Sequence, residues 1–298
     1  MVKPKIAIIG AGKLAYSITS ALIKSGFNVE IVVSRKLSSA KSLAKKFSIP
    51  HHSNSLKNIS EDVNVFFLTV PDGEIKRAAE KLSKLRKNFD DNICIHFSGV
   101  ENISVLNSLR EKNCETGSLH IIRPFPSKKI VDIKNSPASI ETKDKLALEF
   151  STRLCRKLKL KPHRIASDEK VFHHLAAVYS SNFLVGNLFN AFSLISSKNN
   201  IPNDILRKTT QSALDNVFKL SPAKALSGPI DRGDIYTIRK HLNALNVEIK
   251  KTKKNQLKLL RENYIVQSLS LVDVVKAKYG RLSKRHREIK RFLLDELG

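Results

Sequence analysis

Residues 6–15 read Ile-Ala-Ile-Ile-Gly-Ala-Gly-Lys-Leu-Ala, so a short apolar run leads into a glycine-rich turn and then into a helical pattern. The turn has the G-x-G-x-x-A spacing that is typical of the strand–turn–helix unit that binds dinucleotides. Two glycines in such a turn can also be purely structural. We favour the binding interpretation because the strand before the turn, the helix after it and a second apolar run at Val29–Val33 all agree.

Each residue of this turn has an expected role. Gly10 permits the tight bend, and Gly12 lets the pyrophosphate of a dinucleotide approach the backbone. Ala15 lets the following helix pack closely against the sheet. We expect the pyrophosphate to bind the free N–H groups at the positive end of that helix, which opens with Lys13 and Leu14.

The end of the second strand bears on the choice between NAD and NADP. An NAD site places a carboxylate about 20 residues beyond the glycines, where it accepts a hydrogen bond from the ribose 2′-OH. In this chain Val33 is followed by Ser34, Arg35 and Lys36, with no acid among them. A hydroxyl and two cations would bind a 2′-phosphate, which a carboxylate would repel. The alternative is a solvated basic loop, but charge and position together favour NADP as the cofactor.

The carboxyl ends of later strands supply further candidates, because in parallel sheets these ends line the cofactor crevice. Val70 and Pro71 follow the third strand, and we expect them to flank the cofactor. For Asp72 we favour a structural role, in which its side chain caps the helix that starts near Glu74.

Two polar residues at the next strand ends are candidates for the chemistry. Ser98 and Gly99 end the fourth strand, where a hydroxyl and an exposed N–H can hold a carboxamide or a substrate oxygen. His96, inside that strand, is expected to be packing. His120 stands at the following strand end and could serve as acid, as binder or as neither.

Alternating apolar runs and helical patterns fill the first half of the chain. Buried strands separated by amphipathic helices predict the α/β class, with a Rossmann-like doubly wound and mostly parallel sheet covered on both faces. The predicted strands are 6–9, 29–33, 63–70, 93–97, 118–122, 138–141 and 162–165, and the predicted helices are 14–24, 37–47 and 143–158.

The strand signal disappears after residue 166, and only helical patterns follow. We therefore predict a Rossmann-like domain over 1–166, an all-α substrate and dimerisation domain over 167–280, and a basic helical extension over 281–298. The predicted helices are 168–197, 203–219, 234–250, 253–279 and 281–296, separated by prolines and glycines.

The first of these helices has no charged residue from Val171 to Ser197, a length that could span a bilayer. Its several His and Asn residues would be costly in lipid, so we expect a buried helix of a soluble protein and no membrane partner. At 100° per residue Ser181 lies roughly 20° from His174, and Asn182 roughly 80° away. These three side chains form either a polar face toward the crevice or a set of mutually satisfied core groups.

A second distinctive stretch, Gly228–Asp234, reads Gly-Pro-Ile-Asp-Arg-Gly-Asp. Its rigid turn carries charges of both signs and leads into a helix. We expect Asp234 to cap that helix, and Arg232 could bind the carboxylate or phosphate of a substrate.

Charge is the unusual feature of the composition. The chain has 53 Lys and Arg residues against 27 Asp and Glu, a net charge of +26. The absence of Trp, the presence of only 5 Tyr and the lack of a stacking pattern weigh against a nucleic-acid partner. A basic surface also suits an enzyme that binds anionic small molecules.

Cysteine and histidine spacing indicates neither a disulfide framework nor a metal site. The three cysteines, Cys94, Cys114 and Cys155, are widely spaced and are expected to be reduced thiols in the cytoplasm. The adjacent pairs His51-His52 and His173-His174 lack ligand spacing, so we predict no metal.

The order of these motifs along the chain resembles that of a bacterial protein family. The residues that carry the resemblance are Gly10–Ala15, Val70–Asp72, Ser98-Gly99, His120, His174 with Asn182, and Leu226–Asp234 with His241. That family joins a Rossmann-like domain to a helical domain of unknown function, and its members are described as NADP-dependent oxidoreductases. Its layout is similar to that of pyrroline-5-carboxylate reductase, the deazaflavin-dependent NADP reductases and the β-hydroxyacid dehydrogenases. The resemblance implies the 6-phosphogluconate-dehydrogenase-like architecture, NADP and a homodimer formed through the helical domain.

We therefore expect an oxidoreductase that transfers hydride to or from a C=N or C=O group of a small anionic metabolite. His174 is the expected acid or base, since an imidazole titrates near neutral pH. Asn182 would orient the substrate, Arg232 would neutralise its charge, and the helical domain would cap the crevice. The alternative is an NADP-binding sensor or scaffold protein without catalytic activity.

Overall fold

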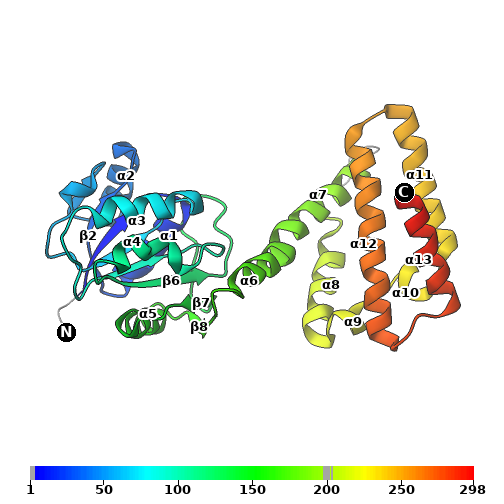
Figure 1. Cartoon of the computed structure of the whole chain (residues 1–298). Helices are drawn as coiled ribbons and strands as arrows, with labels where there is room; N and C mark the ends of the chain where they lie inside the picture. Colours follow the sequence, from blue (N-terminus) through cyan, green and yellow to red (C-terminus); the bar gives the residue numbers. More distant parts are fainter. Residues whose placement is uncertain (1–3, 197–201, 203) are drawn as a thin grey trace. The chain divides into compact units, whose positions relative to one another are not determined.

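The computed structural model describes residues 4–196, 202 and 204–298 (Figure 1). The chain forms two compact units, Met1–Val185 and Gly186–Gly298. The first unit thus includes residues 167–185, which the sequence pattern placed with the helical domain.

An eight-stranded sheet forms the centre of the first unit, in the order β3-β2-β1-β4-β5-β6-β7-β8. All neighbouring strands are parallel except β6 and β7, which are antiparallel. The predicted doubly wound, mostly parallel sheet is therefore confirmed. The strands are β1 (Lys5–Ile9), β2 (Asn28–Val33), β3 (His51–Ser53), β4 (Val65–Leu68), β5 (Ile93–His96), β6 (Glu115–Ile121), β7 (Pro137–Glu141) and β8 (Lys161–Arg164).

Both faces of the sheet are buried, which explains why its central strands are almost wholly apolar. Along β1, Ile6 and Ile8 enter one apolar core, whereas Ala7 and Ile9 enter a second core. Helices α1 (Lys13–Lys24), α2 (Leu37–Phe47) and α5 (Lys145–Lys157) cover the first face, and α3 (Ile75–Ser83) and α4 (Asn107–Arg110) cover the second. Short 3₁₀ turns, η1 (Leu56–Asn58), η2 (Asp72–Glu74) and η3 (Ile103–Leu106), complete the connections.

Strand β3 is absent from the predicted strands. It has three residues and pairs in parallel with the end of β2, and both histidines are exposed. A strand this short, without apolar alternation, produces no periodic signal in the sequence.

The predicted helix over 168–197 is interrupted within the described residues. It consists of α6 (Lys170–Ala177), a π-helical turn η4 (Val178–Asn182) and α7 (Phe183–Ser196), while residue 197 lies outside the described part of the chain. A π-turn has more residues per turn than an α-helix, so it rotates everything that follows. The predicted 20° between His174 and Ser181 assumed a regular α-helix and is therefore wrong.

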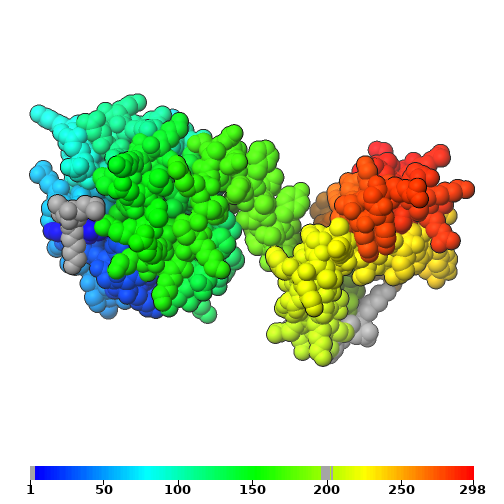
Figure 2. All heavy atoms as spheres, turned by 90° about the horizontal axis from the view of Figure 1, so that it is seen from below, coloured from blue at the N-terminus to red at the C-terminus, as the bar shows by residue number. Residues whose placement is uncertain are grey.

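The second unit is helical as predicted. Most of α7 belongs to this unit, which starts at Gly186. Its further helices within the described residues are α8 (Arg207–Leu220), α9 (Pro222–Ala225), α10 (Pro229–Arg232), α11 (Ile235–Thr252), α12 (Asn255–Tyr279) and α13 (Lys284–Leu297). Ile289 and Leu293 of α13 are fully buried in a core shared with α10, α11 and α12. Residues 281–298 are thus an integral part of this unit, and Figure 2 shows α12 and α13 (orange and red) packed together.

Within the described residues, no helix has both the length and the apolar character that a membrane span requires.

Candidate functional site

The glycine turn follows β1 and is shaped by close approach to the end of β4. Gly10 has a φ of +112°, and a Cβ there would lie 2.6 Å from the carbonyl carbon and oxygen of Thr69. At Gly12 the φ is −81°, and a Cβ would meet only the Thr69 oxygen, at 3.6 Å. The fold itself therefore requires glycine at position 10 but not at position 12. Helix α1 starts directly after Gly12 and has no side-chain cap, which leaves its N-terminal N–H groups for a ligand.

A cavity of about 700 Å³ opens beside this turn. The described residues that line it include six cationic side chains and a single carboxylate, Glu74. Arg35 lies 3.4 Å from Glu74 and keeps 76% of its side chain exposed. An anionic ligand would be attracted into this cavity. The cations are Arg35, Lys36, Lys57, Arg77, Lys81 and Lys84.

The structure brings most of the predicted cofactor residues together. Gly10, Gly12, Ser34, Arg35, Val70 and Pro71 all line this one cavity. Lys13 and Leu14 form the first turn of α1 beside it. The cavity is also lined by α3, which carries two of the six cations, Arg77 and Lys81, and is followed directly by a third, Lys84; the sequence analysis did not connect this helix with the cofactor.

The capping role favoured for Asp72 is wrong. Asp72 is exposed at the start of η2, and the side chain at the N-cap of α3 is that of Glu74, which makes no capping hydrogen bond. Because the 3₁₀ turn η2 precedes α3, the helix starts at Ile75, and Asp72 does not occupy its N-cap position.

Further along the same edge of the sheet, two imidazoles meet above Gly99. His120 lies in β6 and His174 in α6, and their ring centroids are 5.7 Å apart with planes at 60°. A Cβ at Gly99 would lie 2.5 Å from Nδ1 of His174 and 2.8 Å from Nε2 of His120. Glycine is needed here to make room for both rings. Nδ1 of His174 is buried and has no hydrogen-bond partner among the residues that the structure describes.

Burial lowers the pKa of His120 from 6.5 to about 4. The nearby charges of His174, Lys170 and His163 lower this pKa further, while Asp72 opposes them. His120 is therefore neutral at physiological pH, so it can accept or donate a hydrogen bond but carries no acidic proton.

This low pKa predicts a loss of stability on acidification. Between pH 6.5 and about 4, His120 is protonated in the unfolded chain but stays neutral in the folded chain. The free energy of unfolding therefore falls as the pH falls through this window. We expect His120→Gln to lose less stability than the unsubstituted chain between about pH 7 and about pH 5, measured by urea unfolding. Equal acid sensitivity of the two proteins would contradict the low pKa.

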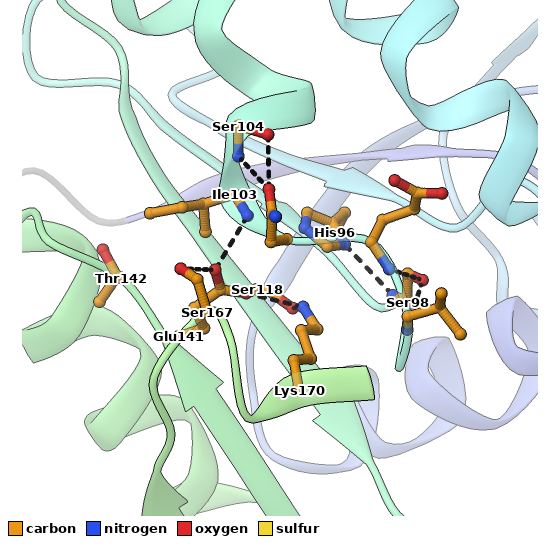
Figure 3. A network of polar contacts seen from close by, with 12 residues as sticks. His96, Ser98, Ile103, Ser104, Ser118, Glu141, Thr142, Ser167 and Lys170 are labelled. Atoms are coloured by element: carbon orange, nitrogen blue, oxygen red, sulfur yellow. Dashed lines mark hydrogen bonds and ion pairs between the residues drawn. The ribbon is translucent and has the colours of Figure 1, made fainter. Parts of the chain in front are cut away.

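A buried polar network at the start of α6 was missed by the sequence analysis (Figure 3). Lys170, the first residue of α6, is 1% exposed, and its ammonium donates to Ser118 of β6 and to Glu141 of β7, the latter at 2.9 Å. Glu141 also accepts from the backbone N–H of Ile103 at 3.0 Å and from the hydroxyl of Ser167 at 2.6 Å. The available signal was the spacing of Lys170 and His174, which puts them on one helix face.

Ser98 has a structural function in its loop. Its buried hydroxyl oxygen accepts hydrogen bonds from the backbone N–H groups of Val100 at 3.1 Å and Glu101 at 2.9 Å. This arrangement shapes the loop that presents Gly99, whereas contact of Ser98 with a ligand stays a prediction. His96 is fully buried, as expected for packing, and its Nδ1 accepts from the N–H of Ser98 at 3.3 Å.

Asn182 ends the π-helical turn with an exposed side chain, and its Oδ1 accepts from the hydroxyl of Ser181 at 2.9 Å. The single proton of that hydroxyl is shared with the carbonyl of Ala177, which also lies at 2.9 Å. The two polar groups thus satisfy one another locally. The substrate-orienting role of Asn182 stays a prediction.

The Gly228–Asp234 turn belongs to the second unit and is anchored to its C-terminal helices. Asp231 accepts from the ammonium of Lys278 at 2.9 and 3.0 Å and from Tyr279 at 3.2 Å. The capping role of Asp234 is confirmed, since its carboxylate accepts from the N–H of Thr237 at 3.1 Å. Arg232 is exposed at the end of α10, and its binding of substrate stays a prediction.

All three cysteines are free and buried, and burial raises their pKa, to about 12 for Cys114 and Cys155. Among the described residues, no group of three or more His, Cys, Asp or Glu side chains is arranged to hold a metal ion.

Two family models match this chain. Residues 5–97 match the model described as NADP oxidoreductase, coenzyme F420-dependent, and residues 136–260 match the model described as a domain of unknown function, DUF2520. No curated protein matches the chain. The first match contains the glycine turn and most of the cation-lined cavity, so the predicted cofactor, NADP, is confirmed at the level of the domain family.

Several solved structures share the fold. A Bacteroides fragilis protein named as a candidate NADP oxidoreductase is 24% identical, with a TM-score of 0.75 over 90% of this chain and 98% of that one. An Aspergillus terreus reductive aminase in complex with NADPH and ethyl-5-oxohexanoate is 10% identical, with a TM-score of 0.58 over 99% and 94%. A Coxiella burnetii pyrroline-5-carboxylate reductase is 15% identical, with a TM-score of 0.54 over 90% and 98%.

At these identities the structural likeness shows the fold alone. As the motifs predicted, the chain is similar to coenzyme F420-dependent NADP oxidoreductases over residues 5–97 and to the DUF2520 domain of unknown function over residues 136–260.

Proposed function

We propose that this chain transfers hydride between NADP(H) and a C=N or C=O group of a small anionic metabolite. The observation that carries the proposal is the cation-lined cavity at the glycine turn. Thr69 and Val70, which follow β4, line this cavity. Strands β4 and β5 are parallel neighbours, so the end of β5, which leads to Gly99, lies beside the end of β4. A cation-lined cavity and a pair of histidines thus occupy one edge of one sheet.

The residues present fit NADP. The open space at Gly12 and the uncapped N-terminus of α1 suit a pyrophosphate. Ser34, Arg35 and the other cations of the cavity suit the 2′-phosphate, because guanidinium and ammonium groups form strong charge-assisted hydrogen bonds to phosphate. When bound, the nicotinamide of this cofactor supplies or accepts the hydride.

The chain itself has to hold the substrate and move one proton. Reduction of a carbonyl adds hydride to carbon and a proton to oxygen, and oxidation reverses both transfers. Because His120 is neutral, His174 is the imidazole of the pair that we assign to exchange this proton. Its unpartnered Nδ1 supports this assignment. His120 would accept or donate a hydrogen bond without changing its charge.

The remaining elements of the proposal concern the substrate and the assembly. Two proteins with this fold are named as a reductive aminase and a pyrroline-5-carboxylate reductase, which supports a C=N or C=O substrate. Arg232 would bind the negative charge of the substrate, Asn182 would orient it, and Ser98 would contact the carboxamide or a substrate oxygen. We further propose a homodimer formed through the helical domain, located in the cytoplasm.

The test is oxidation of NADPH, followed by absorbance, against a panel of small 2-oxo acids, aldehydes and cyclic imines. We expect turnover with at least one of them, and we expect His174→Ala to lower it by at least about 100-fold, which is the usual contribution of a general acid or base. The Kd for NADPH should stay within about twofold. The matched control is His52→Ala, which removes an exposed imidazole of β3.

Two outcomes contradict the proposal. No turnover across the panel with tight NADPH binding would favour a sensor or scaffold protein. Unaltered turnover of His174→Ala would discard the role of this histidine.

A further inference from the structure

Helix α6 contacts strand β6 through two pairs of side chains. The ammonium of Lys170 donates to the hydroxyl of Ser118, and the ring of His174 meets the ring of His120. Lys170 and His174 are four residues apart and so share one helix face, whereas Ser118 and His120 are two residues apart and share one face of the strand. The two contacts therefore follow one another along both elements.

The first contact is fixed firmly by Glu141. Its carboxylate pairs with Lys170 at 2.9 Å, and the two side chains are 1% and 3% exposed. The same carboxylate binds the N–H of Ile103 ahead of α4 and the hydroxyl of Ser167 ahead of α6. Glu141 thus ties the start of α6 to two neighbouring segments, and a buried charge with this many partners tolerates little displacement.

We propose that Lys170, held by Glu141, is a positioning residue that places His174 against His120 and Gly99. Lys170 does not reach a ligand itself, because its ammonium is enclosed between Ser118 and Glu141. It acts through His174 one helical turn further on. The catalytic use of His174 rests on the proposed function, but its position is a property of the free chain.

Lys170 also acts on His120 through its charge. The charged and titratable groups near His120 are Lys170 and His174 from α6, His163 from β8 and Asp72 from η2, and the first three lower its pKa. Removal of the Lys170 charge therefore changes two properties together, the placement of His174 and the titration of His120.

The experiment is histidine NMR on the cofactor-free full chain with labelled imidazoles. The unsubstituted chain should show a ring-to-ring NOE between His120 and His174, and His120 should titrate near pH 4. In Lys170→Met with Glu141→Gln, both charges are absent while the glutamine oxygen still accepts from Ile103. We expect this double variant to lose the NOE and to raise the pKa of His120 measurably. Lys161→Met, an exposed lysine of β8, is the matched control and should change neither signal.

The double variant is preferred over Lys170→Met alone, which would leave the Glu141 carboxylate buried and unpaired. The proposal is overturned if the NOE and the His120 titration persist in the double variant. Unfolding of the double variant would also overturn it, because the pair would then be a general element of stability. Absence of NADPH binding by the unsubstituted chain would instead refute the proposed function and leave the NMR result standing.

Discussion

Gly12→Ala is expected to weaken NADPH binding by roughly 10- to 100-fold, equivalent to about 1.4–3 kcal/mol of overpacking against the pyrophosphate. The protein itself has room for the added methyl group, whose nearest neighbour would be the Thr69 oxygen at 3.6 Å. The backbone at Gly12 also has an ordinary φ of −81°. The melting temperature without cofactor should therefore stay within a few degrees. Fluorescence titration and thermal unfolding measure the two quantities separately.

Gly10→Ala provides the contrast within the same turn. Its Cβ would lie 2.6 Å from the Thr69 backbone, at a φ of +112° that L-residues rarely adopt. We expect a loss of about 3–5 kcal/mol in unfolding free energy, the range of severe steric and backbone strain. If Gly12→Ala unfolded the chain, or bound NADPH as tightly as the unsubstituted protein, the glycine turn would not be the site of the pyrophosphate.

Arg35→Asp is expected to reverse the preference between the two cofactors. The substitution removes a charge-assisted hydrogen bond worth about 1.5–3 kcal/mol and adds repulsion, so NADPH should bind roughly 100-fold more weakly or worse. NADH lacks the 2′-phosphate and should lose little, since the new carboxylate can accept from the ribose 2′-OH. Titration of both cofactors against the variant checks this.

Lys84→Asp is the matched control for Arg35→Asp. It makes the same charge change in the same cavity, but directly after α3 rather than at the end of β2. We expect a smaller loss of NADPH affinity and no reversal of preference. An equal loss for both cofactors in Arg35→Asp, or an equal effect of the two substitutions, would remove Arg35 from the 2′-phosphate site.

Most of the fold could be predicted because its main elements carry strong periodic signals. The long apolar runs of β1, β2, β4 and β5 are buried on both faces of the sheet, and such strands are recognisable without any tertiary information. Strand β3 lies at the edge of the sheet and pairs only with β2, and its three residues, His51–Ser53, carry no apolar pattern that would predict a strand. The π-helical turn η4 gave no signal either, because its residues, Val178–Asn182, include no proline or glycine that would mark an interruption of the helix.

The candidate site was predictable where it follows from backbone geometry. The glycine turn and the end of β2 have fixed positions in a doubly wound sheet, which is why Gly10, Gly12, Ser34 and Arg35 meet at one cavity. Lys170 was missed because the analysis of the predicted 168–197 helix considered only its uncharged part, which starts one residue later at Val171. A lysine that stabilises its environment through a distant carboxylate, Glu141, can be identified only once the two strands and the helix are in contact.

The most direct test of the central claim is titration of the purified chain with NADPH and NADH by fluorescence at fixed ionic strength. The cation-lined cavity predicts saturable binding of NADPH, at least about tenfold tighter than NADH, which corresponds to about 1.4 kcal/mol. Binding of neither nucleotide, or equal affinity for both, would contradict the assignment of this cavity to NADP.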